Sequence, residues 1–329
     1  MRNQTLTLLV QVTVSVLILT GLVYDANPEE VWNAISRANP AWLATAIALR
    51  AFTLTLHEVR LWFALLPWGR FPLMHVVIIG WIAGLMNTLL PIRGGDLIGV
   101  ALLRKELSID TSKAIASVGI TAFLEVVLFA SFTLIVLSVG LTRWESLVGV
   151  VTTQRAMGSM TLIILGGIAA AIVLTILSKR FRKRDRPTRR GPLELIRESV
   201  VETGTGLKAW RPVAGNASIG IIQVITMVLS TWALLPALGL QPPLALLAVC
   251  GLIAFGSIAA IVLPQSLGAG PAATAIFVLG FFGISEPDAI AMAALLWLSA
   301  TLPPLATGTI PLIRRIRHMG TLLRTPSAE

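Results

Sequence analysis

Residues 72–107 read PLMHVVIIGWIAGLMNTLLPIRGGDLIGVALLRKEL. A long apolar run from 72 to 91 ends at Pro91, and a shorter one from 94 to 107 follows almost at once. Proline and glycine both break helices, yet the break carries apolar flanks instead of a hydrophilic loop. The stretch therefore predicts two half-helices that meet inside a membrane and return to one side, as a re-entrant hairpin.

The composition of the whole chain supports a membrane setting. Of the 329 residues, 55% are hydrophobic and 13% are charged, with a mean hydropathy of +0.83, whereas soluble domains carry about 25% charged residues. Most apolar runs are long enough to cross a hydrocarbon core of about 30 Å. We therefore expect an all-α polytopic membrane protein, whose apolar segments are 5–24, 41–66, 72–91, 94–107, 112–140, 159–178, 213–238, 243–263, 271–283 and 287–312.

A second break, LPQSLGAGP at 263–271, interrupts the apolar region 243–283 in the same way. Residues 179–190 hold eight basic side chains and one acid, which places this stretch on the cytoplasmic side. The favoured topology has six full spans and two re-entrant hairpins that open to opposite sides, with both termini cytoplasmic. It leaves only three basic residues outside, among 26 in the chain.

The two hairpins predict a pseudo-inverted repeat within a single membrane domain in the inner (plasma) membrane. Its first half is about 1–178, followed by a basic linker at 179–211, a second half at about 212–313 and a basic tail at 314–329. A competing topology has nine full spans and an external N-terminus. It leaves five basic residues outside and requires a segment of 13 residues, 271–283, to cross the bilayer alone, so the hairpin topology is favoured.

Three stretches resemble the transmembrane region of lysylphosphatidylglycerol synthases, a family of flippase-like membrane proteins that also occurs as stand-alone chains. They are HEVRLW at 57–62, NTLLPIRGGD at 87–96, and the 263–271 break with the helix 297–308 after it. Their order and spacing agree over nearly the whole chain. The resemblance implies a membrane-embedded lipid translocation domain, and the synthase activity of the namesake belongs to a separate soluble domain.

The chain departs from the family pattern at two positions. The family usually carries an arginine three residues after the acid of the first break, where this chain has Asp96 followed by Gly99. It also usually carries an arginine three residues before an acid in the next span, where this chain has Ala122 and Glu125. Two expected cations are therefore absent.

Arg93 is the first candidate for a binding residue. A cation at membrane depth costs about 2.5–3.5 kcal/mol, so it normally faces a cavity, a partner or a substrate. Together with the backbone N–H groups of Gly94 and Gly95 at a helix start, its guanidinium is suited to a phosphate. The alternative is that Arg93 pairs with Asp96 to fix the turn. Asn87 is expected to bond either freed backbone groups or a headgroup.

Further candidates lie on neighbouring spans. Arg50 and Glu58 are eight residues apart and share one face of segment 41–66. Glu58 and Arg60 belong either to the site or to an interfacial cluster near the cytoplasmic end. Glu125 lies deep within its span, and we expect it to pair with Arg50 or Arg93. In the second break, Gln265 and Ser266 either bind headgroup oxygens or only line the turn.

The leading hypothesis is that the protein binds or translocates an anionic phospholipid or a polyprenyl-phosphate-type lipid. The alternative is a non-catalytic accessory subunit of a membrane glycosyltransferase or lipid-modifying enzyme. Nucleotide-binding glycine loops, nucleophile elbows and metalloprotease motifs are absent from the sequence. We therefore expect no catalytic residue, no metal and no cofactor, and the basic residues between apolar segments suggest lipid headgroups and not nucleic acid.

Overall fold

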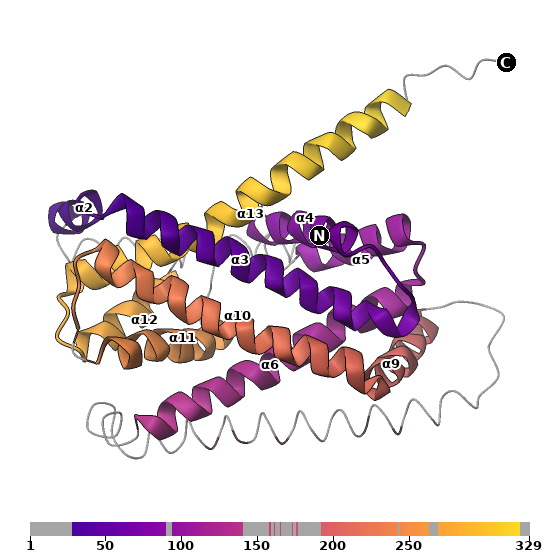
Figure 1. The fold of residues 1–329 in the computed structure, drawn as a ribbon, viewed down its shortest axis with the longest axis horizontal. Coiled ribbons are helices and arrows are strands. Elements are labelled where there is room, and N and C mark those ends of the chain that lie inside the picture. Colours follow the sequence, from indigo (N-terminus) through magenta and orange to yellow (C-terminus); the bar gives the residue numbers. More distant parts are fainter. Residues whose placement is uncertain are drawn as a thin grey trace. The chain divides into compact units, whose positions relative to one another are not determined.

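The computed structural model describes residues 28–89, 94–140, 192–242, 244–262 and 269–322, together with isolated positions between 158 and 176. Every regular element in these ranges is a helix (Figure 1). They are α2 Pro28–Ser36, α3 Pro40–Leu65, the short 3-10 helix η1 Leu66–Trp68, α4 Leu73–Leu89, α5 Gly94–Leu107, α6 Thr111–Val139, α9 Pro192–Lys208, α10 Trp210–Ala237, α11 Ala245–Val262, α12 Ala269–Gly280 and α13 Glu286–Leu322.

The predicted class, an all-α membrane protein, is confirmed. Three of the described helices are long and apolar enough to cross a membrane: Thr111–Val139, Trp210–Ala237 and Glu286–Arg315. Leu73–Leu89 and Ala245–Gly256 are shorter apolar helices. The predicted span 5–24 lies outside the described residues, and 159–178 is described only at isolated positions. The number of spans and the hairpin topology therefore stay predictions.

Local signals in the sequence set the helix ends. Asn39 caps α3, because its side-chain oxygen accepts hydrogen bonds from the backbone N–H groups of Ala41 and Trp42. Ser285 begins α13, where its hydroxyl bonds to the Asp288 carboxylate two residues inside the helix end. Gly239 follows α10 with a φ of +70°, a conformation that glycine adopts without strain.

The chain forms two compact units, each assembled from three separate stretches. The first unit contains Met1–Thr53, Phe123–Ala170 and Ile221–Ala300, and the second contains Leu54–Ala122, Ala171–Gly220 and Thr301–Glu329. The four long helices α3, α6, α10 and α13 each contribute residues to both units. The sequence predicts two repeat halves that follow each other in the chain, and this division stays a prediction.

The first unit has an apolar core built from the α11–α12 pair and the first part of α13, with contributions from α6 and α10. α11 and α12 pack against each other on either side of the second predicted break (Figure 1). Polar contacts join α3 to α10 in the same unit. The Ser230 hydroxyl donates a hydrogen bond to the Ala46 carbonyl at 2.9 Å, and the Thr53 and Thr226 hydroxyls are 3.0 Å apart.

Candidate functional site

The α4–α5 hairpin of the second unit contains the first predicted break. Gly95 of α5 lies directly against α4: a Cβ placed on it would be 2.0 Å from the Ala83 carbonyl oxygen and 2.6 Å from the Asn87 backbone nitrogen. One turn later, a Cβ on Gly99 would be 3.2 Å from the Cβ of Ala83. Since later residues of α5 meet earlier residues of α4, the two helices run antiparallel and touch through a pair of glycines four residues apart.

The same contact gives a physical reason for one departure from the family pattern. Gly99 is buried on the α4 side of α5, so any larger side chain at this position would begin against Ala83. Ala122, the second position where the family carries an arginine, is instead exposed on α6. The first missing cation is therefore replaced by helix packing, whereas nothing in the structure explains the second.

A polar contact joins α4 to α5 beside the break. The Asn87 amide donates a hydrogen bond from Nδ2 to Oδ1 of Asp96 at 2.8 Å. The other amide atom, Oδ1 of Asn87, is buried and accepts no hydrogen bond within the part of the chain that the structure describes. Asp96 lies in the first turn of α5, where the helix dipole favours an acid. Asn87 thus bonds the Asp96 side chain, a partner that differs from the backbone groups or headgroup expected from the sequence.

The structure does not describe three of the predicted site residues. Arg93, Gln265 and Ser266 lie outside the described residues, as does the rest of both breaks at 90–93 and 263–268. Arg93 immediately precedes Gly94, the first residue of α5, and is six residues after Asn87. Its assignment to phosphate or to Asp96 stays a prediction.

Two further helices hold the hairpin through close contacts with α4. Glu58 of α3 is 5% exposed, and its carboxylate rests on Gly80: a Cβ placed there would lie within 2 Å of Oε2. Gly308 of α13 meets α4 on the backbone, where a Cβ would be 2.5 Å from the Trp81 carbonyl oxygen. Glycines at 80, 95 and 308 therefore let three helices approach α4 closely.

Arg60 is fully buried among neighbouring helices, and whether it belongs to the site or to an interfacial cluster with Glu58 stays a prediction. Its exposed fraction is 0%, and its Nε donates to Oδ1 of Asn216 at 3.1 Å. Nδ2 of Asn216 returns a hydrogen bond of 2.8 Å to the Arg60 carbonyl oxygen, and Nη2 of Arg60 reaches the Thr121 carbonyl at 3.4 Å. The reciprocal pair and the Thr121 contact satisfy part of the hydrogen-bonding capacity of this buried guanidinium, which lowers the cost of its burial.

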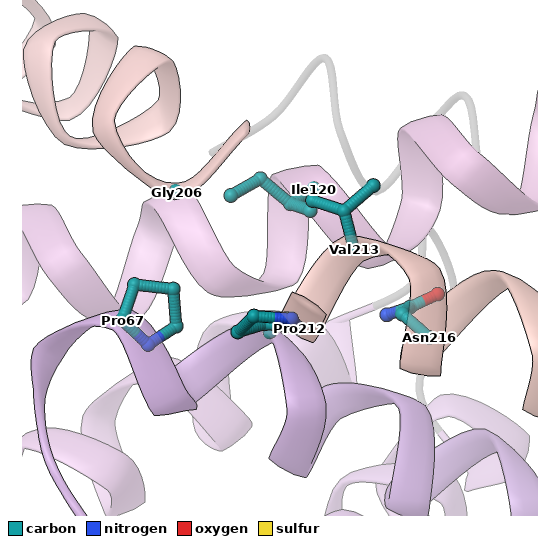
Figure 2. Close-up of a pocket in the computed structure, with 7 residues that line it drawn as sticks. Pro67, Ile120, Gly206, Pro212, Val213 and Asn216 are labelled. Carbon is teal, nitrogen blue, oxygen red and sulfur yellow. The ribbon is translucent and has the colours of Figure 1, made fainter. Parts of the chain in front are cut away.

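The Arg60 network borders a narrow apolar crevice, shown in Figure 2 with Asn216 at its edge. Gly206 of α9 allows this close packing, since a Cβ placed on it would be 2.5 Å from Cδ1 of Ile120. The crevice is too narrow to hold a water molecule, and it is lined by Ala64, Pro67, Ile120, Gly206, Pro212, Val213 and Asn216. It is a packing junction of α3, α6, α9 and α10, and it offers no room for a headgroup.

Arg50 and Glu125 belong to the first unit, whereas Glu58, Arg60, Asn87 and Asp96 belong to the second. Arg50 and Glu125 are both partly buried. The predicted pairing of Glu125 with Arg50 or Arg93 stays a prediction.

Sequence reasoning did not identify Asn216 or the ion pair between Arg315 of α13 and Glu106 of α5. Asn216 was recognisable in principle as one of two amide side chains, with Gln223, in the apolar segment 213–238. No three His, Cys, Asp or Glu side chains gather closely enough to hold a metal ion in the residues that the structure describes.

Comparison with known proteins agrees with the resemblance drawn from the three motifs. No curated protein and no solved structure matches the chain. The family described as the lysylphosphatidylglycerol synthase TM region matches residues 8–308, which is nearly the full length. The chain therefore belongs to the lysylphosphatidylglycerol synthase TM region family and is a multi-pass membrane protein of this flippase-like type.

Proposed function

We propose that this protein binds an anionic lipid at the α4–α5 hairpin and moves it across the inner membrane. One observation carries the proposal: a hydrogen-bonded amide and carboxylate, Asn87 and Asp96, lie at the broken end of an otherwise apolar hairpin, directly beside the sequence position of Arg93. Polar side chains at such a place are costly in a membrane unless they serve a partner or a substrate.

The chemistry of these groups suits a phosphorylated headgroup. A guanidinium offers paired N–H donors to phosphate oxygens, and the N-terminus of α5 adds backbone N–H groups and a positive dipole end. The buried Oδ1 of Asn87 is an acceptor that a headgroup hydroxyl or amine, or the Arg93 side chain itself, would satisfy. The substrate is thus an anionic phospholipid or a polyprenyl-phosphate-type lipid.

Transport, and not catalysis, is the activity proposed for the hairpin. The pseudo-inverted repeat supports alternating access, in which two halves rock around a midplane site. Because the sequence carries no nucleotide-binding glycine loop, the movement is passive, ion-coupled or assisted by a partner protein. In this topology both termini and the basic stretch 179–190 face the cytoplasm.

Reconstitution into liposomes tests the proposal. Fluorescent phosphatidylglycerol, phosphatidylcholine and a polyprenyl phosphate are compared for movement between leaflets, with wild type, Arg93→Ala and Arg70→Ala. Arg70 is an exposed cation in the connection before α4, so its removal matches the change in charge without touching the hairpin. We expect the wild type and Arg70→Ala to move an anionic lipid and Arg93→Ala to lose that movement.

Three results would overturn the proposal. Failure to move every lipid class, with intact folded protein, would favour the accessory-subunit hypothesis. Equal transport by Arg93→Ala and Arg70→Ala would remove the hairpin from the mechanism. A new lipid product formed by the purified protein alone would show that the activity is enzymatic.

A further inference from the structure

The outer face of α5 carries a groove that the proposed function does not use. Gly95, Gly99 and Leu103 form the buried face of this helix, against α4. On the opposite side, Leu97 is 76% exposed. Together with the start of α6, this side borders an open groove of about 470 Å³, lined by Leu97, Val100, Ala101, Arg104, Lys105 and Thr111.

The polarity of the groove changes along the helix. Its apolar residues lie near the hairpin break, and its two cations lie in the last turn of α5. From Leu97 to Arg104 the helix rises by about 10 Å, which fits within one leaflet of a bilayer whose core is about 30 Å thick. This order, apolar toward the membrane interior and cationic toward the interface, is that of a phospholipid.

We infer that this groove binds an anionic phospholipid of the cytoplasmic leaflet, with its phosphate at Arg104 and Lys105 and an acyl chain along Leu97 and Ala101. The inference rests on the proposed function, because the groove is then the place where lipid reaches the hairpin from the surrounding leaflet. Cations in the last turn are also favoured by the helix dipole, but the dipole does not account for the apolar half of the groove.

The expected preference for an anionic over a zwitterionic lipid follows from the two charges. Each basic residue near an anionic lipid surface contributes about a 5.4-fold preference for the anion, so the pair contributes about 30-fold. A zwitterionic lipid with the same acyl chains gains the apolar contacts only. The groove is therefore expected to prefer phosphatidylglycerol over phosphatidylcholine by this factor.

Photo-crosslinking of the full chain in nanodiscs measures the preference. The probes are phosphatidylglycerol and phosphatidylcholine with the same diazirine-bearing acyl chain, and the labelled peptides are identified by mass spectrometry. We expect labelling at 97–101 by phosphatidylglycerol, about 30-fold above that by phosphatidylcholine. The double variant Arg104→Gln/Lys105→Gln should lose most of this preference.

Two further variants make the test specific. Arg211→Gln/Arg314→Gln removes the same charge from two exposed cations outside the groove and should keep the preference. Ala101→Trp fills the groove without changing its charge and should reduce labelling by both lipids. Equal labelling by the two lipids in the wild type, or the same loss in the control pair, would overturn the inference.

Measuring groove labelling and lipid transport separately shows which of the two proposals fails. Transport that persists without any groove labelling would overturn the groove and leave the proposed function standing. Groove labelling without transport of any lipid would overturn the proposed function alone.

Discussion

Replacing Gly95 by alanine tests the packing of the hairpin most sharply. The added Cβ would lie 2.0 Å from the Ala83 carbonyl oxygen, whereas ordinary contact begins near 3.4 Å. The two nearest atoms, the Ala83 carbonyl oxygen and the Asn87 nitrogen, belong to the backbone of α4. To relieve the clash, α5 must therefore move away by more than 1 Å or α4 must bend. Overpacking of this kind costs about 1–3 kcal/mol, and we expect Gly95→Ala to lower the unfolding temperature by several degrees.

Gly84→Ala is the matched control for this variant. Gly84 lies on α4 like the contact partner Ala83, but a Cβ placed on it would meet nothing within 4 Å. Alanine is favoured over glycine in a helix interior by about 0.8–1.0 kcal/mol, so this variant should be neutral or more stable. The two variants thus carry the same chemical change with opposite expected signs, measured by thermal unfolding in one detergent. If Gly95→Ala were as stable as Gly84→Ala, the close antiparallel packing of α4 and α5 would be wrong.

Two other predictions concern the same unit. On a background without Cys250, the pair Ala83→Cys/Gly99→Cys should form a disulfide under mild oxidation, because the two Cβ positions, 3.2 Å apart, need to separate only slightly to reach the about 3.5–4.5 Å of a disulfide; a free thiol pair would contradict the packing. Asn216→Leu should cost about 1–3 kcal/mol, because it removes the acceptor of Arg60 Nε and the donor to the Arg60 carbonyl. Asn216→Asp keeps the acceptor and should retain more stability, and equal losses in both variants would argue against the reciprocal bonds.

Helix positions were predictable because they depend on local features of the chain. The segment expected at 94–107 is α5 with the same ends, and 112–140 differs from α6 by one residue at each end. Proline, glycine and the length of apolar runs mark these boundaries within a few residues. The short helix α2, Pro28–Ser36, was not singled out, because five of its nine residues are polar, acidic or proline and it forms no apolar run.

The contacts of the polar residues were less predictable. Arg60 lies near the end of α3, but its hydrogen-bond partner Asn216 is 156 residues away in the sequence. The reach of a side chain across the fold depends on which helices pack together, and no local pattern in the sequence specifies this. The glycine contacts were unpredictable for the same reason, because nothing in the sequence around Gly308 indicates that it packs against α4.

Thiol labelling from the two sides of the membrane tests the central claim, that the chain turns back within the bilayer between α4 and α5. Met74, near the start of α4, and Lys105, near the end of α5, are both exposed. A single cysteine at either position can be labelled with a membrane-impermeant maleimide. If residues 72–107 form a hairpin, Met74→Cys and Lys105→Cys should react from the same side, which is cytoplasmic. Reaction of Met74→Cys only from the side opposite to Lys105→Cys would mean that residues 72–107 cross the membrane once, and it would contradict the hairpin.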